Sequence, residues 1–212
     1  SSTLANFPFN SLTLLFGTDA NAAYHIRRRI YQQLTGPLYR SLSTVSSIVV
    51  GQLLGEGESG DARYAAGAIL ALGVVTLGAA GAVMFVGAEA LARLFTSDAA
   101  TIDYAVGFTR AFAVAMLPFA VFFPLAGALR GAGDTRTPFY ARLLGSVVFM
   151  LGASYLLAIT LGYGIVGVYA GMVLSYACWA VVVAAGFLRG EWIATAESMI
   201  DDRAAMEAES ED

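Results

Sequence analysis

The sequence predicts an all-α fold, a polytopic bundle of helices that cross a membrane. Hydrophobic residues make up 58% of the 212 residues and charged residues only 13%, and the mean hydropathy is +0.68, outside the usual range of soluble domains. Several apolar runs reach the roughly 20 residues that a spanning helix needs. None of these runs alternates between apolar and polar residues, so the pattern excludes a transmembrane β-barrel.

The apolar runs define one short helix and five longer ones. The short run, 4–16, is below spanning length and is interpreted as the end of a truncated helix. The next, 22–54, is unusually polar, because it contains four arginines and a stretch rich in serine and threonine, and we expect it to face protein or water. The remaining expected helices are 64–90, 104–129, 138–160 and 165–188.

Charge separates a membrane domain, residues 1–190, from a C-terminal tail, residues 191–212. The tail holds 8 of the 16 acidic residues and a single arginine, a composition typical of a solvated, disordered segment. Its charge also argues against nucleic acid as a partner. Basic residues favour the cytoplasmic side of a membrane, and those of one set of connections place the C-terminus in the cytoplasm of a multi-pass cell-membrane protein: Arg63, Arg130, Arg136, Arg142 and Arg189.

Charged side chains inside a span are costly, so they mark a transport pathway or a paired structural contact. Arg40 is the clearest case, and both interpretations stay open for it. Glu89 and Arg93 lie four residues apart and are expected to pair near a membrane surface.

The sequence predicts no enzyme, no cofactor and no metal site. Residues 55–60 match G-x-G-x-x-G, but two carboxylates inside the loop would repel a nucleotide phosphate, so we interpret the segment as a plain turn. His25 is the only histidine and has no catalytic motif beside it. Cys178 is the only cysteine and lies within an apolar run, which excludes a disulfide framework within the chain.

Three stretches, in order along the chain, resemble signatures of one transporter family. Residues 127–138 contain L-R-G-A-G-D-T-R-T-P, which strongly resembles the L-R-G-x-G-D-T-x-x-P between helices ten and eleven of the multidrug and toxic compound extrusion (MATE) family. Residues 50–57 are similar to the V-G-Q-x-x-G-x-G that ends helix eight, and residues 91–98 to the L-x-x-L-F-T-x-D after helix nine. The resemblance implies the C-terminal half of such a transporter, one six-helix lobe whose first helix is truncated.

The resemblance also implies how such a protein works. Two six-helix lobes hold a small organic substrate in a cleft between them and expel it by alternating access, in antiport with H⁺ or Na⁺. The expected partners are therefore membrane lipid, the substrate and the missing N-terminal lobe. Sodium-coupled relatives carry an acid about ten residues before L-R-G, where this chain has Phe119 or an apolar neighbour. The coupling ion stays open between H⁺ and Na⁺.

The signature has a physical interpretation as a loop. Gly131 and Gly133 permit a tight turn, Asp134 can cap the following helix, and Pro138 suits that helix's first turn. The signature residues are Arg130, Gly131, Gly133, Asp134, Thr135 and Pro138.

The expected function is efflux of drugs or other amphipathic, organic-cation-like compounds. One alternative is a lipid-linked saccharide flippase of the same superfamily, which the arginines of 22–54 favour. Another is an inactive, truncated half-transporter. The expected substrate pathway combines aromatic residues with one arginine: Tyr31, Arg40, Phe119, Phe122, Tyr155 and Tyr176.

Overall fold

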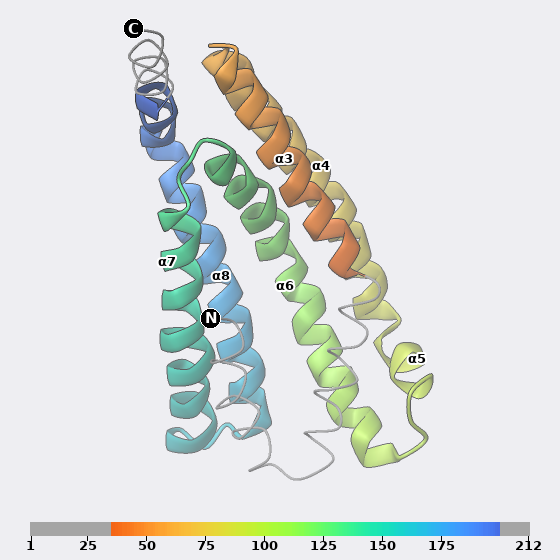
Figure 1. Ribbon diagram of the computed structural model, residues 1–212. Coiled ribbons are helices and arrows are strands. Elements are labelled where there is room, and N and C mark those ends of the chain that lie inside the picture. Colours follow the sequence, from red (N-terminus) through yellow and green to blue (C-terminus); the bar gives the residue numbers. More distant parts are fainter. Residues whose placement is uncertain (1–34, 200–212) are drawn as a thin grey trace, which may run out of the picture.

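The computed structural model describes residues 35–199, and these residues form a helical bundle (Figure 1). This confirms the all-α prediction for the described part of the chain. Expected features at 4–16, at Arg27–Arg29 and at Tyr31 lie outside the described residues. The helices are α3 (Gly36–Gly55), α4 (Ser59–Val86), α5 (Ala88–Arg93), α6 (Ala99–Gly131), α7 (Arg136–Leu144), the π-helical segments η2 (Gly145–Ala153) and η3 (Leu156–Thr160), and α8 (Ile165–Arg189).

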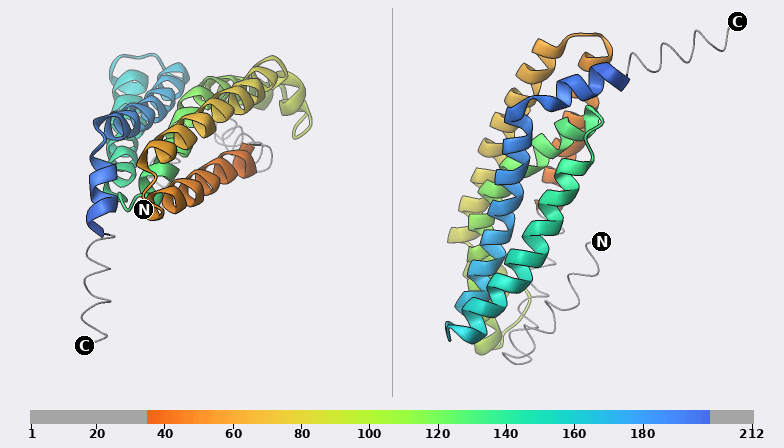
Figure 2. Two further views of the ribbon diagram at one scale, coloured as in Figure 1. Left: turned by 90° about the horizontal axis from the view of Figure 1, so that it is seen from above. Right: turned by 90° about the vertical axis from the view of Figure 1, so that its left-hand side faces the viewer.

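Helix α6 is the centre of the bundle. In its most apolar window 78% of the residues are buried, against 22% in α4 and 39% in α8. It contacts α3 and α4 on one side and α8 on the other, as the view from above shows (Figure 2). Pro118 and Pro124 lie inside α6, which nevertheless continues as one helix.

Four described helices are long and apolar enough to cross a membrane, namely Ser59–Val86, Ala99–Gly131, Arg136–Thr160 and Ile165–Arg189. Helix α3 is not among them, because serine, threonine and Arg40 interrupt its apolar residues. The spans were expected at 64–90, 104–129, 138–160 and 165–188. The observed helices therefore begin up to five residues earlier, since both α4 and α6 include a polar first turn that the hydropathy pattern leaves out.

Glycine lets α4 approach α6 closely. A Cβ added at Gly73 would lie 3.2 Å from the carbonyl oxygen of Ala120, and one added at Gly81 would lie 2.8 Å from that of Ala113. Small residues of this kind let the backbones of membrane helices come into contact.

The seam between α3 and α6 is tighter still. Gly127 and Gly131, one turn apart on α6, lie directly against the backbone carbonyls of Ser43 and Ser47 on α3. Gly131 is the last residue of α6. The expectation that Gly131 permits a turn is therefore wrong, because a helical glycine here provides space for α3.

The turn itself depends on the other signature residues. Gly133 has φ +88°, a left-handed conformation that glycine adopts without strain. The Asp134 Oδ1 atom accepts hydrogen bonds from the backbone N–H groups of Arg136 (3.1 Å) and Thr137 (3.0 Å), so the predicted capping role is confirmed.

The beginning of the C-terminal segment is folded. Residues 191–199 form a helix, and Trp192 is only 1% exposed. Its ring stacks on Phe187 at 5.1 Å, and its Nε1 donates to the Phe187 carbonyl oxygen at 3.0 Å. The expectation of disorder is wrong for this stretch, because one buried tryptophan outweighs the acidic composition that predicted it.

Candidate functional site

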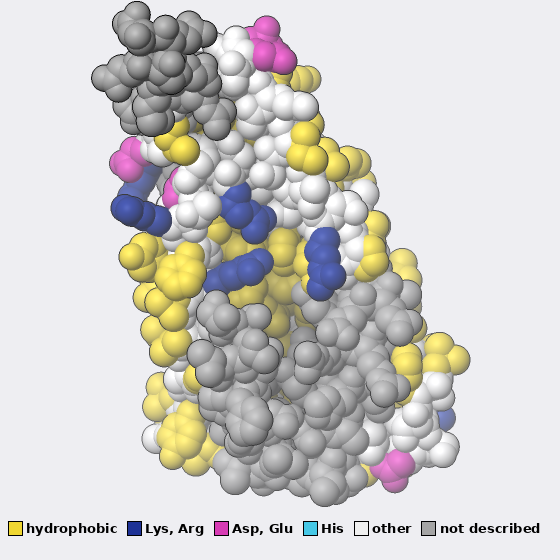
Figure 3. Space-filling view, viewed as in Figure 1, with side chains coloured by type: hydrophobic (Ala, Val, Ile, Leu, Met, Phe, Trp, Pro, Cys, Tyr) yellow, Lys and Arg dark blue, Asp and Glu magenta, His cyan; other side chains and the backbone are white. Residues whose placement is uncertain are grey.

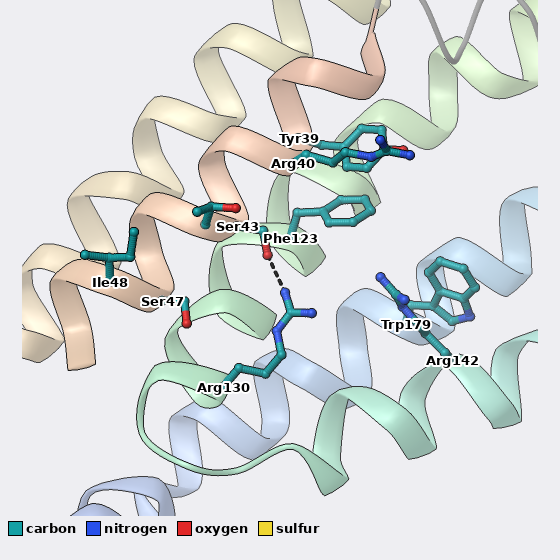
Figure 4. Close-up of a pocket in the computed structure, with 10 residues that line it drawn as sticks. Tyr39, Arg40, Ser43, Ser47, Ile48, Phe123, Arg130, Arg142 and Trp179 are labelled. Atoms are coloured by element: carbon teal, nitrogen blue, oxygen red, sulfur yellow. Dashed lines mark hydrogen bonds between the residues drawn. The ribbon is translucent and has the colours of Figure 1, made fainter. Parts of the chain in front are cut away.

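A cavity of about 660 Å³ opens on one face of the bundle (Figure 3). Basic side chains surround an apolar hollow on that face. Four helices contribute to its wall, which brings together residues up to 140 positions apart in the sequence (Figure 4). The ten lining residues are Tyr39, Arg40, Ser43, Thr44, Ser47 and Ile48 of α3, Phe123 and Arg130 of α6, Arg142 of α7 and Trp179 of α8.

Arg130 stands at the end of the cavity where α6 meets α3. Its Nε donates to the carbonyl oxygen of Ala126 at 3.0 Å, and its Nη2 donates to the hydroxyl of Ser43 on α3. The two contacts fix the plane of the guanidinium (Figure 4). Arg130 was expected only as a family marker in a loop, whereas the structure places it on the cavity wall.

Arg142 lies over aromatic rings from two other helices. Its Cζ atom is 5.2 Å from the ring centre of Phe122, 5.9 Å from that of Phe123 and 5.6 Å from that of Trp179. The faces of these rings carry partial negative charge, which offsets part of the cost of placing a cation inside a span.

Arg40 reaches the same cavity from α3. Three hydroxyl residues of that helix, Ser43, Thr44 and Ser47, line the wall beside it. Of the two interpretations that the sequence left open for Arg40, the structure places it with the cavity-lining residues. No described lining residue is acidic, so the ten residues together carry three positive charges.

The floor of the cavity continues into a cluster of aromatic side chains. Phe119 is 2% exposed and contacts Tyr176 at 4.6 Å and Phe123 at 5.2 Å between ring centres. Tyr39 lies 4.1 Å from Phe123. Phe119 and Tyr176, both expected in the pathway, are thus beneath the wall and support the residues that line it.

Two other expected pathway residues have different positions. Phe122 is fully buried and does not line the cavity, but its ring contacts three lining residues, Arg142, Phe123 and Trp179. Tyr155 is 56% exposed and is not among the lining residues. Aromatic character alone selected Tyr155, and it does not tell which face of a helix a residue occupies.

Of the ten lining residues, the sequence analysis assigned only Arg40 to the pathway and missed the other nine, Arg142 and Trp179 among them. Arg142 was interpreted as a loop residue because charge counts place it near a membrane surface. Trp179 lies in a long uncharged run with no motif around it. Arg142 lies six residues after Arg136, the first residue of its span, and an arginine so near the end of a span is common, so the sequence held no clear signal for it.

A second cavity, of about 800 Å³, lies between the signature turn and the start of the C-terminal segment. Polar residues of both line it, among them Asp134, Arg136, Arg189 and Glu191. In residues 35–199, no three histidine, cysteine, aspartate or glutamate side chains gather closely enough to hold a metal ion.

Known proteins resemble this chain in sequence and in fold. A family model described as MatE matches residues 2–156. The multidrug resistance protein NorM of Burkholderia vietnamiensis is 29% identical over 176 residues, which cover 80% of this chain and 38% of the relative. The chain spans less than half of that relative's length.

Solved structures share the bundle. The MATE transporter ClbM, in complex with Rb⁺, gives a TM-score of 0.81 at 26% identity and covers 92% of this chain and 46% of its own. A MOP superfamily transporter from Pyrococcus furiosus, for which a reversed polarity of the binding pocket suggested a different function, gives 0.79 at 21% identity, over 86% of this chain and 40% of its own.

These matches agree with the geometry. The matched segment includes α3, α6 and α7, which carry nine of the ten cavity residues, and the signature turn that Asp134 caps. From the sequence match, the shared fold and the resemblance of its signatures together, the chain belongs to the MatE family, the multidrug and toxic compound extrusion proteins, whose members are transporters and not enzymes.

Proposed function

We propose that this chain is the C-terminal six-helix lobe of a secondary transporter that exports amphipathic organic compounds. One observation carries the proposal: the cavity combines charged and aromatic side chains from four helices, and three of these helices belong to spans long and apolar enough to cross a membrane. Its volume of about 660 Å³ falls within the range of sites for drug-sized compounds. The similarity to the multidrug resistance protein NorM supports efflux.

The cavity faces a second lobe in this proposal. Relatives are more than twice as long as this chain, and a wall formed from four helices of one lobe needs an opposite wall to enclose a substrate. Transport then consists of the two lobes opening alternately to either side of the membrane.

The proposed location is the cell membrane, with the C-terminus in the cytoplasm. The α3–α4 turn, the signature turn and the end of α8 lie at the same end of the bundle (Figure 1). Arg63, Arg136 and Arg189 are at this end. An excess of arginine supports the cytoplasmic assignment.

The proposed driving force is antiport with H⁺ or Na⁺. Phe119 occupies a core position in α6, at the place where sodium-coupled relatives are expected to carry an acid. The choice between the two ions is decided by gradient experiments.

The test is dye efflux from cells that express this chain alone and from cells that express it with an N-terminal lobe. A panel of amphipathic dyes, ethidium among them, is followed under a proton gradient and then under a Na⁺ gradient. We expect efflux only when both lobes are present and only under the gradient of the coupling ion. No efflux of any dye in any pairing would refute the proposal and favour an inactive half-transporter.

A second candidate function is export of a lipid-linked saccharide. The three arginines of the cavity favour it, because such lipids carry phosphate. The Pyrococcus furiosus transporter, with its reversed pocket polarity, shows a similar fold. Flipping of a fluorescent polyisoprenyl diphosphate saccharide in vesicles, with no efflux of dyes, would favour this function.

A further inference from the structure

We infer that the cavity selects organic anions, with an acidic group bound by the arginines and an aromatic ring on Tyr39, Phe123 and Trp179. The inference rests on the proposed transport function and specifies its substrate class. It reverses the sequence-based expectation of organic-cation-like substrates.

The positive charges converge from three separate helices. Arg40 comes from α3, Arg130 from α6 and Arg142 from α7, and all three border one cavity (Figure 4). For Arg40 and Arg130, none of the described lining residues offers a carboxylate that would neutralise the charge. A cation entering this space is repelled by Arg40 and Arg130, whereas an anion is attracted by both.

The hydrogen-bond donors around the cavity also match an anion. A guanidinium presents N–H groups in a planar fork that fits carboxylate, sulfonate and phosphate oxygens. Arg130 already has a fixed plane, since Ala126 and Ser43 hold two of its donors. The hydroxyls of Thr44 and Ser47 supply further donors on the same wall.

The aromatic side chains restrict the rest of the substrate. Phe123 and Trp179 lie beside Arg142, and Tyr39 lies beside Phe123 at 4.1 Å. Flat ring faces next to guanidinium groups favour a substrate whose own ring carries or adjoins the acidic group. The chemical class is thus an amphipathic aromatic carboxylate, sulfonate or phosphate.

The experiment uses two dyes that share a xanthene ring system and differ in charge. Fluorescein is an anion at neutral pH and rhodamine 123 is a cation. Efflux of each is measured from cells that express this chain with its partner lobe. We expect fluorescein efflux to exceed rhodamine 123 efflux, and Arg40→Gln to lower fluorescein efflux about tenfold, the loss of one charge-assisted hydrogen bond.

Matched variants separate charge at the cavity from charge elsewhere. Arg110→Gln removes an arginine of α6 that lies over Phe85 at 5.6 Å and does not line the cavity, so efflux of both dyes is expected to stay unchanged. Arg40→Lys keeps the charge and is expected to retain part of the fluorescein efflux. The amount of each variant in the membrane is measured to correct for folding.

The outcomes distinguish failure of the anion inference from failure of the transport proposal. Efflux of rhodamine 123 but not of fluorescein, or fluorescein efflux that is unchanged in Arg40→Gln and Arg142→Gln, overturns the anion inference and leaves the transport proposal standing. Efflux of neither dye, nor of any dye in the panel, overturns both. If a polyisoprenyl diphosphate competes with fluorescein, the anion site binds a lipid phosphate. If it does not compete, the site binds soluble anions. Either result supports the inference, provided that fluorescein efflux depends on Arg40.

Discussion

Gly127 and Gly131 lie one turn apart on α6 and determine how closely that helix approaches α3. A Cβ at either position would collide with a backbone carbonyl of α3, and backbone atoms cannot swing aside as a flexible side chain can. The same two residues belong to the L-R-G signature, so part of this family marker is a packing requirement.

The seam gives a prediction at the level of one residue. Gly131→Ala is expected to lower the free energy of unfolding by about 1–3 kcal/mol, the usual cost of overpacking a filled interior. The control is Gly67→Ala on α4, where nothing lies within 4 Å of the added Cβ and where alanine favours a helix by up to about 1 kcal/mol. Thermal unfolding of both variants in detergent checks this, and equal midpoints would contradict it.

Asp98 caps the N-terminus of α6 and connects its stability to pH. Its carboxylate accepts a hydrogen bond from the Thr101 backbone N–H at 2.8 Å, and hydrogen bonding to Thr101 lowers the pKa of Asp98. A group whose pKa is lower in the folded state stabilises above its unfolded pKa, and this stabilisation is lost as pH falls through the folded pKa.

We therefore expect the cap to weaken below about pH 4, the ordinary range of an aspartate pKa. Asp98→Asn keeps an accepting oxygen but does not titrate. The stability advantage of the native protein over Asp98→Ala is expected to shrink on acidification, while that of Asp98→Asn over Asp98→Ala stays constant. Thermal unfolding midpoints of the three proteins, measured as a function of pH, test this expectation. Midpoints that fall in parallel for all three proteins would refute a role of the Asp98 carboxylate in the pH dependence.

At the scale of single residues, the sequence predicted the place of Arg40 at the cavity but not that of Arg142. A single arginine in a polar span is visible in the sequence, and its cost in a membrane points to a pathway. Arg142 lies near the start of a span, where an arginine is common, and only the packing of α7 beside α6 and α8 turns it toward the cavity. Residue type predicts which groups are costly, whereas helix rotation decides where they point.

At the scale of elements, the helix at 191–199 shows how one side chain attaches a segment. Trp192 fills a buried site beside Phe187, and Met199 lies close to Gly133 in the signature turn. The helix at 191–199 thus covers the turn that connects α6 to α7.

We expect Trp192→Ala to release this segment without unfolding the bundle. Losing a buried tryptophan in a core costs about 3–5 kcal/mol, which exceeds what one short helix can retain from its other contacts. Hydrogen exchange of residues 191–199 is expected to accelerate, while exchange in α6 stays slow. Trp192→Phe keeps the stacking on Phe187 and serves as the control; unchanged exchange in Trp192→Ala would contradict the role of this contact.

The elements themselves were largely predictable, and the reason is physical. A lipid environment requires long apolar helices, so hydropathy alone locates α4, α6, α7 with its π-helical extension, and α8. The π-helical winding was not predictable, because the apolar composition of 138–160 suits an α-helix equally well.

At the scale of the whole molecule, the bundle has two distinct ends. The α3–α4 turn and the signature turn lie at one end, and the α5–α6 and η3–α8 connections lie at the other (Figure 1).

Cysteine labelling tests this topology. Cys178 is the only cysteine, so Cys178→Ser gives a background without reactive thiols. A membrane-impermeant thiol reagent is expected to label Ser97→Cys and Tyr163→Cys in intact cells, and Glu58→Cys and Thr135→Cys only after the membrane is opened. Labelling of Glu58→Cys and Tyr163→Cys from the same side would refute the arrangement.

The two tryptophans of the chain, Trp179 and Trp192, report on separate places. Trp179 lines the arginine-rich cavity, with its indole nitrogen buried and without a hydrogen-bond partner among the described residues, while Trp192 belongs to the helix at 191–199 and packs against Phe187 of α8. In a Trp192→Phe background, the tryptophan fluorescence of this chain, excited selectively at a wavelength that tyrosine does not absorb, arises from Trp179 on the cavity wall alone. The wavelength of the emission maximum then reports how far water reaches the cavity wall, without any added label.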